Sequence, residues 1–174
     1  IAAFNRYQTL DTVRAVCDSS RADEIALYTG NDDNIIADLL TPYEFVVNGE
    51  KKEKHFVGGL LGHWAVWTSK AVSLLKEIKQ CKLNHYAGSG DLLKKGIEVT
   101  DMNAAIFDAK NAFKGSIAGI HEILRRQGLL EGIWCISPKE VLSEGQLEEI
   151  DRICARYPHN MDDAFARSII GKGL

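Results

Sequence analysis

The first stretch of this sequence whose residue types suggest chemistry is a polar loop that follows a short apolar segment. Residues 25–28 form an apolar run that is too short for a helix and typical of a buried strand. Residues 29–34 are Thr, Gly and four Asn or Asp, and residues 35–40 then show helical spacing. Ligands of α/β proteins bind in loops at the carboxyl ends of such strands. The alternative is an ordinary surface loop in which Asn31 or Asp33 caps the next helix.

A second candidate region is the glycine-rich stretch GGLLGHW at residues 58–64. Clustered glycines at the end of a strand let a ligand or a neighbouring element approach the backbone closely. The stretch matches neither the dinucleotide-binding glycine motif nor the spacing of a phosphate-binding loop. His63 lies within it and can donate or accept a proton near neutral pH. The alternative for His63 is a hydrogen-bonded packing residue beside the tryptophans.

The elements that would position these loops alternate between strand and helix in the first 40 residues. Residues 1–4 are apolar and resemble the end of a strand, and residues 5–8 are polar and loop-like. A helix is expected from about Thr9, which can cap it, with Leu10, Val13, Val16 and Cys17 on one face. The strand from Glu24 and the helix after Asn34 follow, and that helix must end by Thr41-Pro42. This order is the rhythm of βα units around a parallel sheet.

Residues 43–57 allow two interpretations. Residues 43–47 and 54–57 are both strand-like, and Asn48-Gly49 between them is the strongest short signal for a hairpin. On the first interpretation the chain forms a charged hairpin whose second arm is the solvated segment 50–54. On the second, the segment is a loop insertion before one buried strand that begins near His55.

The rest of the sequence predicts helices. A helix over 68–80 would bury Val72, Leu75 and Ile78, and residues 84–96 are expected to be a polar loop with at most one turn of helix at Leu92-Leu93. Further helix starts and ends are indicated by capping residues and by prolines or glycines. These signals are Asp101, before Ala105, Ile106, Ala109 and Phe113; Ser116 and Gly128; Ser137-Pro138-Lys139-Glu140; Ser143-Glu144-Gly145-Gln146, before Leu147, Ile150 and Ile153; Pro158; and Asn160 or Asp162.

Composition excludes several classes of protein. The 174 residues carry a net charge of −3, which gives no electrostatic basis for binding nucleic acid or an anionic membrane. The longest apolar runs are only a few residues, so no transmembrane helix is expected. Cys17, Cys81, Cys135 and Cys154 are far apart and form no metal-binding pair, so we expect free thiols in a reducing, cytoplasmic compartment and no metal site.

The expected elements do not close into a complete fold. Only two or three strands are visible, all within the first 65 residues, whereas a parallel sheet needs more strands and helices on both faces. The chain is therefore either a compact, mostly helical domain with a small sheet or the back part of a larger α/β protein. The abrupt apolar start at Ile1 favours the second interpretation.

The order and the motifs of these pieces resemble the C-terminal half of the dihydrodipicolinate synthase and N-acetylneuraminate lyase family. Residues 28–33 (YTGNDD) are similar to the S-G-D-D segment after strand seven of that family's barrel, and residues 55–60 look like strand eight. Residues 114–130 and 137–157 resemble the family's C-terminal helices. The likeness is closest to a branch described as dihydrodipicolinate-synthase-like, through FNRYQTL from Phe4, LYTGNDDN, GGLLGHW and LRRQGLLEG.

This resemblance implies an α/β fold that is the C-terminal part of a TIM (β/α)₈ barrel followed by C-terminal helices. Residues 1–82 would be the last βα units, from the end of strand six to helix eight, and residues 83–174 the helical extension. The family is a class I aldolase or lyase family, in which a strand-six lysine forms a Schiff base with pyruvate or a related 2-oxo acid. The matching position lies just before Ile1, so no catalytic residue is expected within this chain. The resemblance implies no cofactor, and it implies that the protein forms a homo-oligomer.

Several residues of this chain would line the substrate pocket if the resemblance holds. Gly30 matches a glycine whose backbone lies against the substrate, and Gly58 matches a strand-eight position whose carbonyl faces the imine. Asn5, Arg6, Asn31, Asp32 and His63 would lie on loops at the carboxyl face. Arg6 could hold a substrate carboxylate in its fork, and the alternative is a solvated loop arginine. The stretch 58–64 and the longer segment 41–54 depart from the family pattern, which leaves the substrate and retention of the activity open.

Since a barrel needs about 250 residues, this chain cannot complete one alone. A missing N-terminal half would be explained by a fragment, by a break or a modified lysine in the chain, or by a partner half on a separate chain. The function that the sequence indicates is a Schiff-base lyase or aldolase for a small 2-oxo acid. The alternative is a non-catalytic interaction module or a small-molecule sensor on a barrel remnant, and a lysine directly before Ile1 would discriminate between them.

Overall fold

A computed structural model of the chain describes residue 1 and residues 5–60 and 65–171. The fold is mixed α/β, with many helices and two small sheets, which confirms the coarser part of the predicted fold class. The chain divides into two compact units. Unit 1 comprises Ile1–Leu61 and Leu75–Gly96, and unit 2 comprises Gly62–Leu74 and Ile97–Leu174. The barrel and the predicted division after residue 82 stay predictions.

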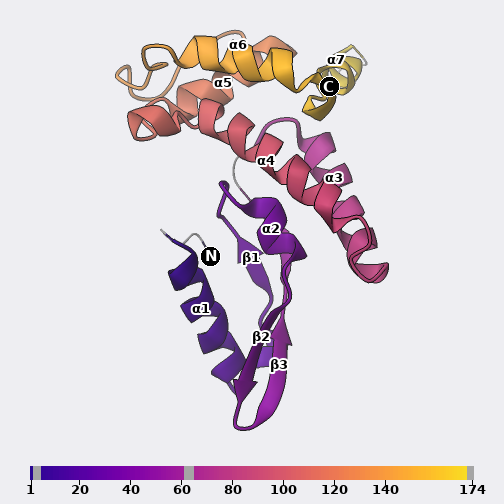
Figure 1. Cartoon of the computed structure of the whole chain (residues 1–174). Coiled ribbons are helices and arrows are strands. Elements are labelled where there is room, and N and C mark those ends of the chain that lie inside the picture. Colours follow the sequence, from indigo (N-terminus) through magenta and orange to yellow (C-terminus); the bar gives the residue numbers. More distant parts are fainter. Residues whose placement is uncertain (2–4, 61–64, 172–174) are drawn as a thin grey trace. The chain divides into compact units, whose positions relative to one another are not determined.

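Unit 1 is built on two short parallel strands, β1 (Leu27–Thr29) and β4 (Phe56–Gly59). Their register pairs Leu27 with Phe56 and Thr29 with Gly59. Helix α1 (Arg6–Asp18) and the 3-10 turn η1 (Ala22–Glu24) precede β1, and α2 (Ile35–Leu40) follows it. The helix, strand and helix of the predicted βα order are confirmed (Figure 1), whereas the predicted strand end at residues 1–4 lies, apart from Ile1, outside the described residues. α2 ends at Thr41, before the proline, as predicted.

Ile1 lies beside β1 and pairs with it through its backbone. Its nitrogen donates to the carbonyl oxygen of Tyr28 at 2.6 Å, and the N–H of Gly30 donates to the carbonyl oxygen of Ile1 at 2.5 Å. Ile1 therefore bonds to Tyr28 and Gly30, the two residues that flank Thr29. This is the hydrogen-bond pattern of a residue that lies opposite Thr29 on a parallel neighbour. Ile1 is thus bonded to β1, and β1 in turn pairs with β4.

The two interpretations of residues 43–57 each describe a part of the structure. β2 (Tyr43–Val47) and β3 (Glu50–Lys54) form an antiparallel hairpin, the two-stranded arm at the bottom of Figure 1. Asn48 and Gly49 form its turn, both with positive φ (53° and 82°), as a type I′ turn requires. The buried strand β4 then begins at Phe56. α1 packs against the hairpin, where Arg14 lies 5.2 Å above the centre of the Phe45 ring.

The prediction for the start of α1 is wrong. Residues 5–8 are not a loop, because Asn5 is the N-cap and its side chain accepts a hydrogen bond from the N–H of Gln8 at 3.1 Å. Asn caps a helix as well as Thr does, and the helix begins after the earlier of the two capping residues, Asn5. The buried face consists of Thr9, Val13 and Cys17, whereas Leu10 is exposed.

The prediction of a loop over 84–96 is also wrong. α3 (Thr68–Leu83) is followed by a short turn, and α4 (Ser89–Ile106) then includes Gly90, Gly96 and the expected cap Asp101 in its interior. Glycine lowers helix propensity, but tertiary packing overrides it here. A Cβ on Gly96 would lie 3.3 Å from the Cβ of Ile36, so glycine permits α2 and α4 to approach closely.

Unit 2 is a helical cluster around a continuous apolar core. It contains the second half of α4, α5 (Ser116–Gln127), α6 (Gln146–Arg156) and α7 (Asp163–Ile170), with the 3-10 turns η3 (Ala109–Asn111) and η4 (Pro158–Asn160) between them. The core includes Trp67, Met102, Ile106, Ile123, Ile150 and Ile153. The predicted ends at Gly128 and Pro158 and the predicted start at Asp162 are confirmed.

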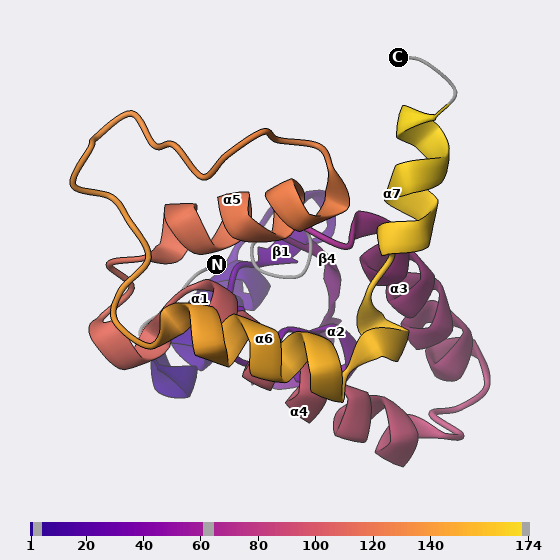
Figure 2. The ribbon, with the colours of Figure 1, turned by 90° about the horizontal axis from the view of Figure 1, so that it is seen from above.

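Three details of the helical predictions need correction. The Ser137-Pro138-Lys139-Glu140 capping pattern starts no helix but lies in the long loop between α5 and α6, drawn in orange in Figure 2. Local signals do not suffice there, because the adjacent Ile136 is fully exposed and no apolar face is buried. Val72 and Leu147, which the sequence predicts to be buried, are exposed, and Ala109 and Phe113 lie beyond the end of α4 at Ile106. In α3 the prediction is right for Ile78, Leu75 is half-buried, and the other buried positions are Ala71, Leu74 and Cys81.

Candidate functional site

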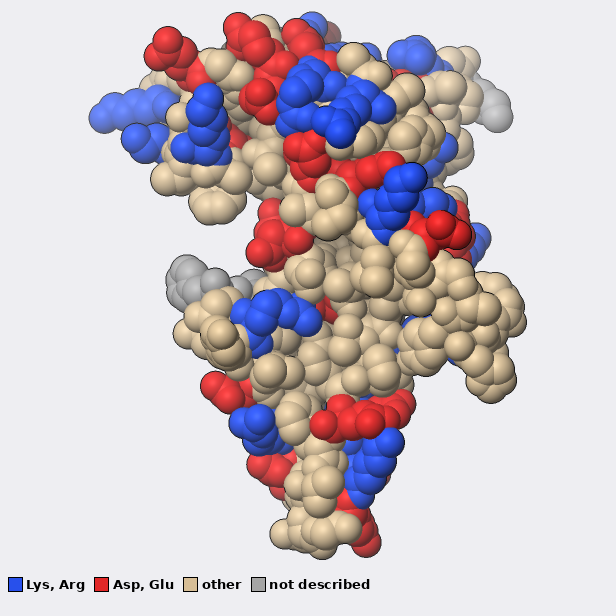
Figure 3. Space-filling view, in the orientation of Figure 1, with Lys and Arg blue, Asp and Glu red and all other residues tan. Residues whose placement is uncertain are grey.

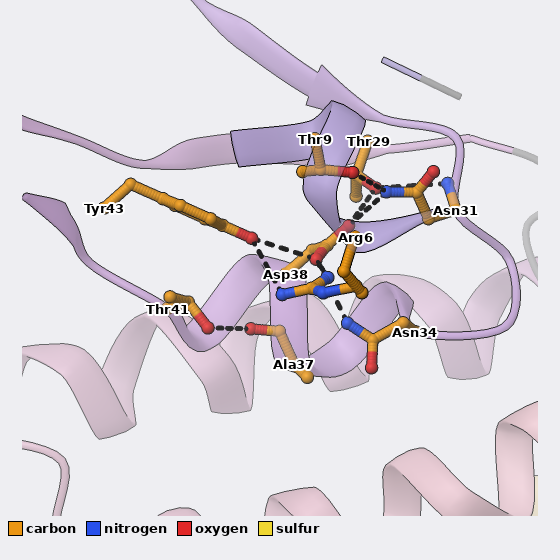
Figure 4. Close-up of polar contacts among 9 residues, drawn as sticks. All are labelled: Arg6, Thr9, Thr29, Asn31, Asn34, Ala37, Asp38, Thr41 and Tyr43. Carbon is orange, nitrogen blue, oxygen red and sulfur yellow. Dashed lines mark hydrogen bonds and ion pairs between the residues drawn. The ribbon is translucent and has the colours of Figure 1, made fainter. Parts of the chain in front are cut away.

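The polar loop after β1 is held by a buried carboxylate, Asp38, which has no exposed side-chain area. Its Oδ2 accepts a hydrogen bond from the Thr29 hydroxyl at 2.7 Å and one from Asn31 Nδ2 at 2.8 Å (Figure 4). Asn31 Nδ2 also lies 3.3 Å from the hydroxyl of Thr9 on α1, and the Asn31 N–H donates to Thr29 Oγ1 at 3.2 Å. Asp38 therefore ties the end of β1 and its loop to α1.

The other oxygen of Asp38 binds three further donors. Arg6 Nη1 forms an ion pair with Oδ1, the Tyr43 hydroxyl donates to it at 3.0 Å, and Asn34 Nδ2 donates at 3.1 Å. Arg6 Nη2 also donates to the Tyr43 hydroxyl oxygen at 3.2 Å. A buried charge is tolerated when it is paired and its oxygens are saturated with donors, and both conditions hold here. We call these residues the Asp38 network: Arg6, Thr9, Thr29, Asn31, Asn34, Asp38 and Tyr43.

The ionisation of the Asp38 network is set by burial and by mutual contacts. Burial, followed by the adjacent negative charge of Asp38, raises the pKa of Tyr43 to about 12, so this hydroxyl stays a donor. Burial opposes the charged form of Arg6, but its bonds to Asp38 outweigh that effect and raise the pKa of the guanidinium. With five donors on its two oxygens, Asp38 is a positioning residue.

The network lies at the carboxyl end of β1, where the sequence predicts a ligand-binding loop. Thr29 is the last residue of β1, and its carbonyl accepts a hydrogen bond from the N–H of Leu60, just beyond β4. Gly30 is buried, with its N–H bonded to Ile1. The same end of the sheet therefore brings together the backbone of Ile1, Gly30 and Leu60 with the side chains that support them.

Asp32 is a titratable residue of the loop that does not belong to the Asp38 network. It is half-buried, and burial, then the nearby charge of Asp33, raise the pKa of its carboxyl above the ordinary value. A carboxyl group with a raised pKa is able to accept and release a proton closer to neutral pH.

The remaining predicted site residues have separate positions. Asn5 caps α1 and has a structural role. Gly58 faces the ring of Tyr28: a Cβ at Gly58 would lie 2.6 Å from the Tyr28 Cζ. Arg6 is half exposed, but two of its nitrogens already donate to Asp38 and Tyr43, so its fork is not free to hold a carboxylate with both. His63 lies outside the described residues.

The structure adds residues to the site that the sequence did not indicate, namely Asp38, Tyr43, Thr9 and Thr29. Asp38 is the only polar residue of the apolar segment 35–40, and this isolation was the one signal that could have marked it. Tyr43 follows a proline at the start of a strand and gives no such signal. Their contacts span up to 37 residues of chain, which local patterns do not report.

Charge and composition add little to this description. On the face drawn in Figure 3 acidic and basic side chains are interspersed, so that face has no large surface of one sign. In the described part of the chain, no group of three or more His, Cys, Asp or Glu could hold a metal ion. No helix in the same part is both long and apolar enough to cross a bilayer.

No protein-family model, curated protein or solved structure matches this chain.

Proposed function

We propose that this chain is the C-terminal part of a (β/α)₈ lyase or aldolase that forms a Schiff base with pyruvate or a related 2-oxo acid. The observation that carries the proposal is the parallel pairing of Ile1 with β1. Ile1, β1 and β4 lie side by side in chain order, separated by α1 and by α2 with its hairpin, which is the order of successive barrel strands. The parallel sheet and its polar carboxyl end support the same proposal.

In this proposal the catalytic lysine precedes Ile1 on the strand next to β1. Its neutral amine attacks the keto carbon of the 2-oxo acid, water leaves with the keto oxygen, and a protonated imine forms. The imine accepts electrons when the adjacent carbon–carbon bond is made or broken. Gly30 allows the substrate to approach the backbone, and Asp32 exchanges a proton with it. The Asp38 network holds the loop that carries both residues.

The proposal is tested by trapping the imine in the full-length protein. With pyruvate and borohydride, we expect a stable mass increase on a lysine directly upstream of Ile1, in a protein much heavier than the 19.3 kDa of this chain. Replacing that lysine by arginine should abolish the adduct, since arginine keeps the charge but does not form the imine. Asp38→Asn should slow adduct formation without abolishing it, because Asp38 acts only through the loop. An upstream lysine that gives no adduct with pyruvate or with any of a panel of 2-oxo acids would contradict the proposal.

The second candidate function is a non-catalytic interaction module or a small-molecule sensor. It is favoured by one observation, that both oxygens of Asp38 are saturated, which is also the pattern of a purely structural network. A sensor would retain Gly30 and the polar loop but lack the lysine. It would be stabilised against heat by its 2-oxo acid without forming any adduct.

A further inference from the structure

A hollow of about 610 Å³ opens in unit 1 along β4, α2 and α3. This volume lies within the range of about 300–1,000 Å³ that is typical of small-molecule sites. The hollow includes Phe56 at the amino end of β4, whereas the Asp38 network lies at the carboxyl end of β1. The two features meet at Tyr43, a member of the network whose ring contacts the Phe56 ring edge-on, with ring centres 5.5 Å apart.

The walls of the hollow are mainly apolar. Leu39, Phe56 and Ile78 form its floor and are almost completely buried. Leu75 is half-buried and Val57 is 49% exposed, so both have apolar area left to bury. A ligand with a flexible hydrocarbon chain gains about 0.8 kcal/mol for each CH₂ group that such walls remove from water.

Two lysines of α3 give the hollow a positive charge. Lys82 is half-buried, and its Nζ donates to the carbonyl oxygen of Leu39 at 3.2 Å, which fixes the amine at the wall. Neither Lys79 nor Lys82 makes an ion pair within the described part of the chain, and no described lining residue is acidic. The nearest acid, Glu53, has its Oε1 2.5 Å from His55 Nε2. Burial lowers the pKa of Lys82, and a bound anion would reverse that effect.

A third polar residue of the lining lacks a partner at one atom. The Nδ1 of His55 is buried and makes no hydrogen bond. Because Nδ1 has almost no exposed area, it does not itself contact a molecule in the hollow.

The geometry points to a binding site for an anionic amphiphile, a molecule with one anionic head group near Lys79 and Lys82 and an unbranched apolar tail against Val57 and Leu75. Charge complementarity selects the head group and the apolar walls select the tail. This inference does not depend on the proposed Schiff-base function, because it uses neither the loop after β1 nor the upstream lysine.

The test is calorimetric titration of the chain with three ten-carbon probes below their micelle concentrations. We expect saturable 1:1 binding of decanoate, about tenfold weaker binding of decanol and none of decyltrimethylammonium, since a hydrogen bond to a charged group contributes about 1.5 kcal/mol. Added salt should weaken decanoate binding and leave decanol binding unchanged. Equal affinities for decanoate and decanol, or no saturable binding of decanoate, would overturn the inference.

Matched variants on one helix locate the site. Lys82→Met keeps an unbranched side chain without the charge and should weaken decanoate binding about tenfold, whereas Lys76→Met, also on α3 but outside the hollow, should not. Leu75→Trp should block decanoate and decanol alike by filling the space. An unchanged far-UV circular dichroism spectrum shows that each variant is folded. If Lys76→Met and Lys82→Met weaken binding equally, the attraction is non-specific and the inference is wrong.

The other occupant to be distinguished is a second copy of the chain covering the same apolar walls. Sedimentation equilibrium of the chain without and with decanoate separates the two cases. A monomer that binds decanoate supports the inference. A dimer that is dissociated by Leu75→Lys and does not bind decanoate would overturn it.

Discussion

Unit 1 and unit 2 each bury a carboxylate at the centre of a hydrogen-bond network, but the two carboxylates have different partners. Asp38 in unit 1 pairs with the cation of Arg6 and binds four further donors. Asp108 in unit 2 makes no ion pair among the described residues. It is held by Ser143 Oγ at 2.6 Å, Asn111 Nδ2 at 2.7 Å and the N–H of Gly115 at 2.9 Å.

The two networks also connect different elements of the fold. Asp108 joins Asn111 and Gly115, which lie between α4 and α5, to Ser143, which lies before α6. Asp38 connects α1, β1, α2 and β2 around a loop at the carboxyl end of β1. Removing Asp108 leaves neutral donors unpaired, whereas removing Asp38 also leaves a cation without its partner.

The largest effect is therefore expected for Asp38→Ala. The variant should lose about 3 kcal/mol of unfolding free energy, because Arg6, Thr29 and Asn31 lose their acceptor together. Native-state hydrogen exchange should show the loss of protection in residues 27–40 and not in residues 105–120. Asp11→Asn, which breaks an exposed pair with Arg14, is the control and should change stability by less than about 0.5 kcal/mol. Unchanged protection of residues 27–40 would disprove the central role of Asp38.

Asp108→Ala should have a smaller effect, about 2 kcal/mol, confined to unit 2. Here the exchange pattern should be reversed, with loss of protection in residues 105–120 only. Ser143→Ala removes one of the three donors and should cost about 1 kcal/mol. If Asp108→Ala also exposes residues 27–40, the two networks are coupled and the comparison fails.

The two networks should also respond to opposite extremes of pH. Burial raises the pKa of Asp108, but hydrogen bonds from Ser143, Asn111 and Gly115 outweigh burial and hold it below the ordinary value. Its stabilising contribution is thus complete above about pH 4, the unfolded pKa, and is lost as the pH falls through the lower folded pKa. Unit 2 of the wild type should lose protection in this acidic range, and Asp108→Ala should lack this component. A variant with the same acid profile as the wild type would contradict the assignment.

Tyr43 responds to alkali instead. Because its folded pKa is raised to about 12 from an ordinary value near 10, its contribution is complete below about pH 10 and is lost as the pH rises through 12. The tyrosinate absorbance of the wild type minus that of Tyr43→Phe should show one group that titrates near pH 12. At neutral pH the variant should lose about 1 kcal/mol. A difference curve centred near pH 10 would show that the hydroxyl does not lie in the Asp38 network.

The smallest effect is expected for Thr9→Val, which removes the hydroxyl that lies 3.3 Å from Asn31 Nδ2 but keeps the shape of the side chain. Asn31 retains its bond to Asp38, so the loss should be about 0.5–1 kcal/mol. Thr12→Val on the exposed side of the same helix is the matched control and should be nearly neutral. Equal urea midpoints for the two variants would exclude a contribution of Thr9 to the network.

The parts of the fold that could be predicted depend on short stretches of sequence. Asn48-Gly49 predicts its own turn, because few residues tolerate positive φ at two successive positions. Gly128 ends α5 with a φ of 80°, and Pro42 limits α2, for similarly local reasons. α4 could not be predicted, since its glycines oppose a helix locally, and Gly96 is accommodated only because it permits contact with Ile36, sixty residues away in the sequence.

The candidate site divides in the same way. The sequence by itself determined that a polar loop follows an apolar strand and precedes a helix, because strand, turn and helix preferences operate within a few residues. Only the tertiary structure decided that Asp38 points inward and that Arg6 and Tyr43 meet there, 32 and 5 residues away along the chain. Burying a carboxylate is favourable only when its charge and all its lone pairs find partners, and those partners come from separate elements whose packing no local pattern specifies.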